Sequence, residues 1–124
     1  MKLAVVGSRT FNDYELLCAT LNPHLGKIQV IVSGGAKGAD SLAERWAKEN
    51  GVATEVYLPE WEKYGKSAGF KRNELIVENC DSCVAFWDGV SPGTKSSIDL
   101  CKKKGKKHKV ILWRNFHSTS PRTE

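Results

Sequence analysis

The feature of this sequence that most constrains its fold is the regular alternation of two kinds of segment. Short runs rich in valine and isoleucine alternate with longer stretches whose apolar residues recur at helical spacing. This alternation predicts a parallel sheet covered by helices on both faces, because each helical crossover returns the chain to the same end of the sheet. We therefore expect one three-layer α/β domain with a mainly parallel sheet in the order 3-2-1-4-5. The five predicted strands are residues 3–6, 28–32, 54–58, 83–87 and 109–113.

The stretches between the predicted strands indicate four amphipathic helices. Their apolar stripes consist of Leu17, Cys18, Leu21 and Leu25; Leu42, Ala43, Trp46 and Ala47; Phe70, Ile76, Val77 and Cys80; and Ile98 with Cys101. The residues that favour helix N-caps are Asn12 or Asp13 for the first helix, Asp40 or Ser41 for the second, and Thr94 for the fourth. Gly51 and Gly105 stand where the second and fourth helices are expected to end.

The chain length of 124 residues suits one domain with its own core. We expect this domain to cover residues 1–115 and residues 116–124 to form a flexible tail, because the apolar content falls after Phe116. No segment approaches the roughly 20 apolar residues of a membrane span, and the start lacks the apolar block of a signal peptide, so a cytoplasmic location is expected. The four cysteines are too few for a disulfide framework and are expected to be reduced thiols.

The positive charge of the chain is concentrated in one place. The formal net charge is +5, but six lysines lie within residues 102–109 (KKKGKKHK), and without them the net charge falls to −1. Lysines at the end of the predicted fourth helix complement the helix dipole, which is enough to explain them. The same lysine run (residues 102–109) could also contact nucleic acid through its phosphates.

Three glycine-containing loops each follow a predicted strand and precede a predicted helix: residues 7–11 (GSRTF), 33–40 (SGGAKGAD) and 88–94 (DGVSPGT). Loops at the carboxyl ends of parallel strands share one edge of the sheet, where α/β proteins bind their ligands. Glycine, small hydroxyl residues and helix N-termini offer backbone N–H groups to an anion, and Arg9 and Lys37 add positive charge. The pattern predicts a phosphate site, with the alternative that the glycines only make tight turns.

Several other kinds of site are less well supported. Residues 34–38 (GGAKG) match neither the dinucleotide fingerprint nor the P-loop, and no acidic residue ends the second predicted strand, where it would bind a ribose. Cys80 and Cys83 have the spacing of a redox or zinc pair, but they end a helix and begin a strand. The three histidines are scattered along the sequence. We expect no cofactor and no metal.

With these motifs the sequence resembles the YspA-type branch of the SLOG superfamily. The motifs that carry the resemblance are GSRTF, SGGAKGAD, WEKYGK (residues 61–66), AGFKRN (residues 68–73), VAFWDG and SPGT. The resemblance implies a Rossmann-like fold with a site for a nucleotide or nucleotide-derived ligand at the loops after the first, second and fourth strands. The superfamily also includes the Lonely Guy phosphoribohydrolases, ligand sensors and DNA-processing proteins, so the fold does not fix a reaction.

The phosphoribohydrolases of this superfamily carry the signature P-G-G-x-G-T-x-x-E. The comparable stretch here, SPGTKSSID, has Ser97 where the glutamate would stand, and its nearest carboxylate is Asp99. Cleavage of an N-glycosidic bond benefits from a carboxylate that stabilises an oxocarbenium-like transition state. Hydrolysis by this chain would therefore need Asp40, Asp88 or Glu74 as a substitute.

The predicted ligand-binding set combines the three loops with Arg72 and Asn73, which the resemblance favours over a solvated helix face. Asp40 is explained equally well as a helix N-cap and as an acceptor for a ribose hydroxyl. Trp61 and Tyr64 could stack on a base, form a hydrophobic lid or lie in a dimer surface. The full set is Gly7, Ser8, Arg9, Phe11, Ser33, Gly34, Gly35, Lys37, Gly38, Asp40, Arg72, Asn73, Asp88, Ser91, Gly93 and Thr94.

Three functions follow from these patterns. The leading one is binding of a nucleotide or nucleotide derivative by a sensor, carrier or sequestering protein. The first alternative is N-glycosidic hydrolysis of a nucleoside monophosphate or an ADP-ribose-type ligand. The second is nucleic-acid binding through the lysine run. The expected partner is a small nucleotide; weak nucleic-acid contact and a homo-oligomer stay open, and no membrane contact is expected.

Overall fold

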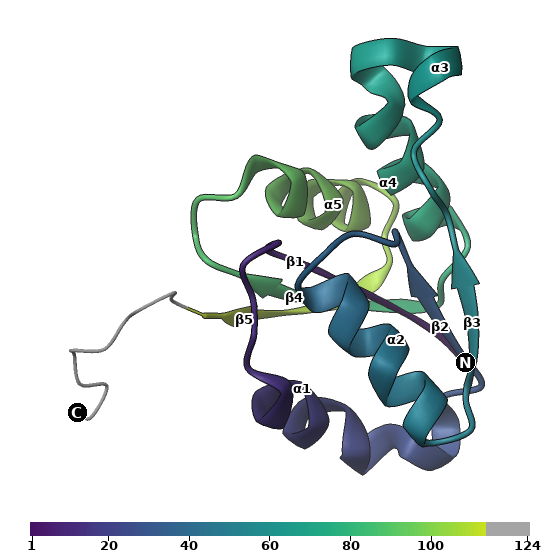
Figure 1. Cartoon of the computed structure of the whole chain (residues 1–124), viewed down its shortest axis with the longest axis vertical. Helices are drawn as coiled ribbons and strands as arrows, with labels where there is room; N and C mark the ends of the chain where they lie inside the picture. The colour runs from purple at the N-terminus through teal and green to yellow at the C-terminus, as the bar shows by residue number, and fades with distance from the viewer. Residues whose placement is uncertain (114–124) are drawn as a thin grey trace.

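The computed structural model describes residues 1–113, and over these residues it has the predicted parallel sheet (Figure 1). Five strands lie in the order β3-β2-β1-β4-β5, all pairs are parallel, and helices cover both faces. The expected tail, residues 116–124, lies outside the described residues. The elements are β1 Lys2–Gly7, α1 Tyr14–Leu21, η1 Asn22–Lys27, β2 Val30–Ser33, α2 Ala39–Glu49, β3 Ala53–Val56, α3 Trp61–Tyr64, η2 Gly65–Ser67, α4 Ala68–Glu78, β4 Ser82–Trp87, α5 Pro92–Lys103 and β5 Lys107–Leu112.

The central strand β1 supplies both faces of the core. Leu3 and Val5 pack with the apolar faces of α1 and α2, whereas Ala4 and Val6 pack with α4 and α5 on the other side. This alternation follows from the two-residue period of a strand, and it makes every residue of the β1 interior apolar. The sheet is therefore the middle of three layers.

Helix starts differ from the sequence prediction at two places. Asp13 caps α1 as predicted, and its Oδ1 accepts a hydrogen bond of 3.0 Å from the N–H of Leu16. The N-cap of α2 is Gly38 instead of Asp40 or Ser41, and the N-cap of α5 is Ser91 instead of Thr94. Asp40 and Thr94 consequently lie inside the first helical turns, where both are buried.

Three further segments depart from the predicted pattern. Pro23 turns the end of the first predicted helix into the 3₁₀ segment η1, because proline removes a helical N–H, and this leaves Leu25 exposed. Phe70 was predicted to lie on the buried face of α4 but is half exposed. The loop between β3 and α4 contains the short helix α3, which projects at the top of Figure 1.

Gly51 and Gly105 follow α2 and α5 with φ of 68° each, as the sequence predicted. All four cysteines are free thiols. Over residues 1–113, no helix has the length and apolar character needed to cross a bilayer.

Candidate functional site

A cavity of about 410 Å³ lies at the carboxyl edge of the sheet, next to the point where the strand order reverses between β1 and β4. Its walls come from the loops after β1, β2 and β4, the first turn of α2, the middle of α4 and the N-terminal half of α5. Ten of the predicted ligand-binding residues meet there: Gly7, Ser8, Arg9, Asp40, Arg72, Asn73, Asp88, Ser91, Gly93 and Thr94.

The β4–α5 loop (residues 88–91) is organised by the carboxylate of Asp88. Its Oδ1 accepts from the N–H groups of Val90 (2.9 Å) and Ser91 (2.7 Å), and its Oδ2 accepts from the Ser91 hydroxyl (2.7 Å). Although desolvation raises the pKa of Asp88, these hydrogen bonds outweigh it and lower the pKa to about 2. The carboxylate therefore stays charged at neutral pH, and its two oxygens accept hydrogen bonds from the loop.

This use of Ser91 leaves the N-terminus of α5 without a side-chain cap. The first helical hydrogen bond runs from the N–H of Lys95 to the carbonyl of Ser91, and Pro92 has no N–H. The N–H groups of Gly93 and Thr94 have no partner among the described residues. Thr94 is only 5% exposed and lines the cavity with Gly93. An uncapped helix N-terminus of this kind is suited to an anion.

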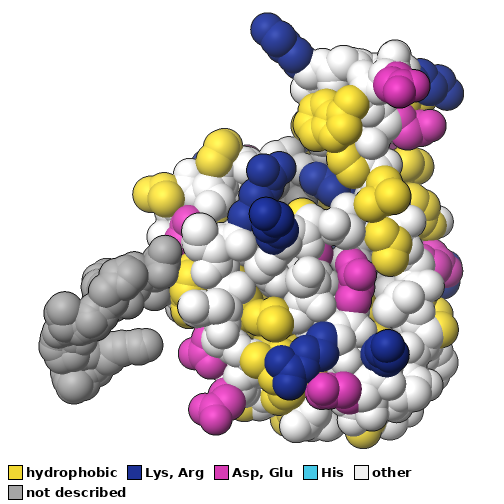
Figure 2. All heavy atoms as spheres, viewed as in Figure 1, with side chains coloured by type: hydrophobic (Ala, Val, Ile, Leu, Met, Phe, Trp, Pro, Cys, Tyr) yellow, Lys and Arg dark blue, Asp and Glu magenta, His cyan; other side chains and the backbone are white. Residues whose placement is uncertain are grey.

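Two guanidinium groups converge on the same cavity. Arg72, in the second turn of α4, donates from Nη1 to the carbonyl of Gly34 (2.7 Å) and from Nε to Oδ1 of Asn73 (3.1 Å), which leaves three of its five N–H donors. Burial lowers the pKa of Arg72, the nearby carboxylate of Asp40 opposes this, and the positive charge of Arg9 lowers it further. Figure 2 shows Lys and Arg side chains gathered where α4, α5 and the end of β1 come together.

The β2–α2 loop (residues 34–38) uses its own N–H groups internally. The N–H groups of Gly34 and Ala36 donate to Oδ2 of Asp40 (3.1 and 3.2 Å), and the N–H of Gly35 donates to the Ser33 hydroxyl (3.1 Å). At the start of α2, the N–H of Ala39 donates to the carbonyl of Ser8 (3.3 Å). The sequence predicted that this loop would bind an anion through its N–H groups. In the structure it supports the wall of the cavity instead, and of residues 34–38 only Ala36 lines the cavity.

Gly38 explains why this loop needs glycine. Its φ is 78°, and a Cβ built there would lie 2.2 Å from the carbonyl oxygen of Ser8 and 2.5 Å from that of Arg9. Only a residue without a side chain allows the loops after β1 and β2 to approach so closely. The glycine thus positions Arg9 at the cavity.

Asp40 is the second carboxylate at the cavity, and its environment is opposite to that of Asp88. Burial raises its pKa from 3.8 to about 6, and the N–H of Ala36, the charge of Arg72 and the N–H of Gly34 only partly offset this. Its Oδ1 takes no part in the two loop hydrogen bonds. Asp40 therefore acts first as a brace for the β2–α2 loop, in the first turn of the helix that it was predicted to cap.

The remaining predicted site residues lie outside the cavity. Phe11 is buried in the core, where it stacks on Phe86 at 4.6 Å between ring centroids and meets Trp113 edge-on at 5.0 Å. The others that do not line it are Ser33, Gly34, Gly35, Lys37, Gly38, Glu74, Trp61 and Tyr64. Trp61 and Tyr64 are in α3, and the Tyr64 ring has Lys63 and Lys71 near its face.

The cavity also has walls that the sequence reading missed: Val6, Thr10, Ala36, Ile76, Pro92 and Ser97. Thr10 follows Arg9 directly, and Ser97 lies one helical turn after Thr94, so their positions gave a signal. Nothing in the sequence indicated that Val6 and Ile76 line the cavity, because an apolar residue in a strand or helix is expected to lie in the core. Within residues 1–113 no three His, Cys, Asp or Glu side chains form a group that could hold a metal ion.

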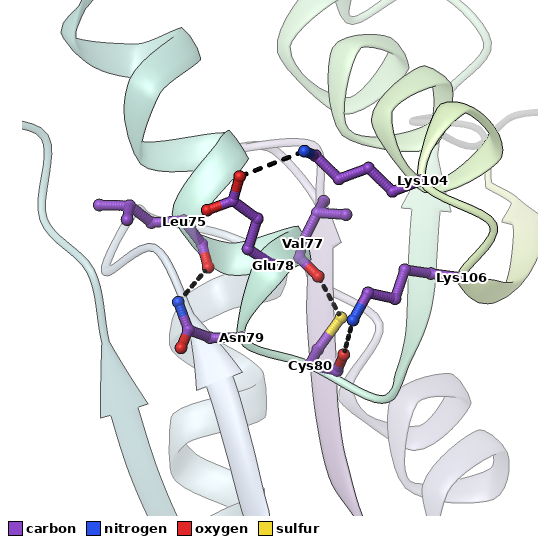
Figure 3. A network of polar contacts seen from close by, with 7 residues as sticks. All are labelled: Leu75, Val77, Glu78, Asn79, Cys80, Lys104 and Lys106. Atoms are coloured by element: carbon purple, nitrogen blue, oxygen red, sulfur yellow. Dashed lines mark hydrogen bonds and ion pairs between the residues drawn. The ribbon is translucent and has the colours of Figure 1, made fainter.

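The lysine run lies at the opposite end of α5 from the cavity. The 12 residues of α5 correspond to about 18 Å, so the predicted glycine loops and lysines do not form one continuous patch. Figure 3 shows that two of the lysines are used locally. Lys104 pairs with Glu78 at 3.2 Å, and Nζ of Lys106 donates to the carbonyl of Cys80 at 2.8 Å.

Comparison with known proteins places the chain in a family. The model of the YspA, cpYpsA-related SLOG family matches residues 1–64. The chain belongs to this family. A relative, Gene 61 protein of Mycobacterium phage D29, is 35% identical in an alignment 113 residues long that covers 84% of this chain and 90% of that protein.

Solved structures of DNA processing protein A (DprA) share the fold. DprA from Streptococcus pneumoniae matches with a TM-score of 0.75 and 23% identity over 93% of this chain, which spans about half (51%) of the DprA chain. DprA from Helicobacter pylori, described in terms of its single-stranded DNA binding mode, matches with a TM-score of 0.71 and 22% identity over 95% of this chain and 68% of that one. At these identities the likeness concerns the fold alone.

Proposed function

We propose that this protein binds a nucleotide or nucleotide-derived ligand in the cavity, with a phosphate held at the N-terminus of α5. The observation that carries the proposal is the pair of N–H groups at Gly93 and Thr94, which have no partner within residues 1–113, in a cavity that two arginines also line. The buried Thr94 adds a hydroxyl, and Arg9 and Arg72 add charge that suits phosphate geometry. Such a site serves a sensor, carrier or sequestering protein.

The carboxylates support binding better than hydrolysis. Asp88 is committed to three hydrogen bonds and stays ionised, and Glu74 does not line the cavity. Asp40 is left as the one carboxylate of the three with a raised pKa at the cavity. If the ligand is turned over, Asp40 is therefore the residue on which turnover depends.

A second candidate is single-stranded nucleic acid, whose backbone phosphate would occupy the same place. The DprA of Helicobacter pylori, which has this fold, is described as binding single-stranded DNA. A strand that reached from the cavity to the lysine run would follow α5 for about 18 Å. Lys102, Lys103, Lys107 and Lys109 are exposed there.

The test is titration calorimetry of the protein with AMP, ADP-ribose and short oligothymidylates with and without a 5′-phosphate. Arg9→Ala removes an exposed guanidinium without disturbing the core and is expected to weaken binding at least tenfold, since a hydrogen bond to a charged group contributes roughly 1.5–3 kcal/mol. The matched control is Lys48→Ala, an exposed cation near the far end of α2. Equal binding by Arg9→Ala and the wild-type protein would contradict the proposed site.

The two sources of phosphate differ in their salt dependence. A strand that contacts several phosphates loses affinity steeply as salt rises, with a slope near −0.7 per neutralised charge, whereas a mononucleotide at one site does not. Replacing Lys102, Lys103, Lys107 and Lys109 by Gln should leave mononucleotide binding unchanged and weaken a strand that follows α5. Chromatography of the same mixtures for a released base, repeated with Asp40→Asn, tests hydrolysis.

A further inference from the structure

The two edges of the sheet are built differently, and β3 is the edge without protection. Among residues 1–113 it pairs only with β2, which leaves its outer N–H and C=O groups without a partner there, and the strand ATEV carries no lysine or proline. Its single charged residue, Glu55, is paired with Lys2 at 2.8 Å. Exposed strand edges are usually blocked by charge, proline or a covering element, and an open one favours pairing with another strand.

An exposed apolar surface adjoins this edge. We call it the apolar edge, and its residues lie on β3, α3, α4 and the segment between β3 and α3. Figure 2 shows hydrophobic side chains running down this side of the molecule from α3, and Figure 3 shows Leu75 pointing from α4 toward the β3 side. Its five members, each 42% to 64% exposed, are Val56, Leu58, Trp61, Phe70 and Leu75.

The size of the apolar edge sets it apart from scattered surface residues. Five side chains of these types at these exposures present roughly 500 Å² of apolar surface, against roughly 300–600 Å² for the largest patch of a typical monomer, which is often functional. A stable interface buries about 800 Å² per partner. The apolar edge together with the free backbone of β3 and a polar rim is sufficient for that.

We propose that a second copy of this chain docks on the apolar edge around a twofold axis, with the two β3 strands antiparallel. In this arrangement the two five-stranded sheets join through their unprotected edges, and each copy covers the exposed Leu58 and Trp61 of the other. A twofold axis brings the same patch of both copies together, so the surface must complement itself.

The charges around the apolar edge favour a second copy over other occupants. Glu60 and Glu62 stand beside Lys63 and Lys66, all of them exposed, so both signs of charge border the surface within seven residues. A rim with both signs can complement itself across a twofold axis. Over residues 60–66 the two signs balance, so this part of the rim offers no net positive charge to a nucleic-acid strand or an anionic membrane.

The β5 edge provides an internal comparison. It also carries an exposed apolar residue, Leu112, which is 71% exposed, but the strand begins with the exposed cations Lys107 and Lys109. Two β5 edges facing one another would bring like charges together, so this edge is protected in the usual way. Leu112 is therefore the matched control for Leu58.

The experiment measures molar mass by light scattering and sedimentation over a range of protein concentrations. The wild-type protein is expected to be a dimer at micromolar concentration, Leu58→Glu is expected to weaken dimerisation at least tenfold, and Leu112→Glu is expected to leave it unchanged. Leu58 is exposed, so its substitution should leave the fold of each copy intact, which is checked in parallel by circular dichroism. A monomeric wild-type protein, or a dimer lost in Leu112→Glu but not in Leu58→Glu, overturns the proposal.

Spin labels test the geometry independently of affinity. In a Cys18→Ser background, with the other three cysteines buried, labels at Thr54→Cys are expected within about 20 Å of each other, because both lie near the axis. Labels at Lys109→Cys are expected roughly 40 Å apart, since four interstrand spacings separate β3 from β5 in each copy. The reverse order of distances would assign the interface to β5 and refute the proposal.

Discussion

The β2–α2 loop and the β4–α5 loop lie at the same edge of the sheet and have similar composition, yet they do opposite things with their backbone. In the first, Asp40 and Ser33 accept the N–H groups of Gly34, Gly35 and Ala36, and the Ser8 carbonyl accepts that of Ala39, although α2 itself has no side-chain cap. In the second, Asp88 binds Ser91, and the N-terminus of α5 stays open. Glycine content therefore marks where loops approach closely, whereas the partners of the backbone N–H groups decide where an anion can bind.

The largest effect that tests this contrast is expected from Gly38→Ala. The added Cβ would lie 2.2 Å from the carbonyl oxygen of Ser8, and φ of 78° disfavours any side chain. Strain and clash together should lower the free energy of unfolding by about 3 kcal/mol or more. Urea unfolding measures this, with Gly26→Ala as control because nothing lies within 4 Å of its Cβ. A loss below about 1 kcal/mol would show that the two loops are not held in close contact.

The second test uses the opposite pKa shifts of Asp40 and Asp88. The pKa of Asp40 is about 6 in the folded protein and near 3.8 in the unfolded chain, so the folded state binds a proton more tightly between these values. The stability that this proton contributes is present below pH 4 and is lost as the pH rises through 6, by up to roughly 3 kcal/mol.

Comparing urea unfolding of the wild-type protein and Asp40→Asn from pH 4 to 7 isolates this contribution, since Asn does not titrate. The wild-type protein should lose stability relative to the variant as the pH rises. Asp88 behaves in the opposite direction: its pKa of about 2 contributes stability that is lost only as the pH falls below 3.8. Parallel pH curves for the wild-type protein and Asp40→Asn would contradict the burial of a titrating Asp40.

The sequence predicted the fold well because alternating strand and helix signals leave few topologies open. The helix ends at Gly51 and Gly105 and the alternation that implies parallel pairing are local patterns that a sequence displays directly, and the strand order is one that doubly wound sheets commonly adopt. The N-cap positions were harder to predict. Asp40 and Thr94 are residue types that favour an N-cap, but the structure has Gly38 and Ser91 as the N-cap residues of α2 and α5.

The sequence predicted where the candidate site lies but not which hydrogen bonds organise it. Arg9, Gly93 and Thr94 were predicted at one edge of the sheet, and they line one cavity. What could not be read from the sequence is which polar groups satisfy one another, since the bonds from Ser91 to Asp88 and from Arg72 to Gly34 join residues whose geometry depends on the finished fold. Phe11 was misleading for the same reason, because its loop position hid its packing on Phe86.

The third test separates ligand binding from stability at the open helix end. Gly93 has nothing within 4 Å of a Cβ, so Gly93→Ala should change the free energy of unfolding by less than about 1 kcal/mol. The methyl group would stand beside the N–H groups at the cavity and should weaken nucleotide binding about tenfold in calorimetry. Gly26→Ala again serves as the control. Unchanged affinity in Gly93→Ala would remove α5 from the phosphate site.

The smallest expected effect tests whether the bond between Asp88 and Ser91 keeps α5 uncapped. In Asp88→Ala the Ser91 hydroxyl is released and can accept the N–H of Thr94, as an N-cap serine usually does. Loss of the negative charge of Asp88 should by itself strengthen phosphate binding, and it does so equally in the single and the double variant. The informative comparison is therefore between Asp88→Ala and Asp88→Ala/Ser91→Ala. The double variant should bind nucleotide several-fold more tightly than Asp88→Ala, because alanine cannot cap. Equal affinities in calorimetry would mean that Ser91 does not compete for the N–H groups, and the contrast between the two loops would then depend on the β2–α2 loop alone.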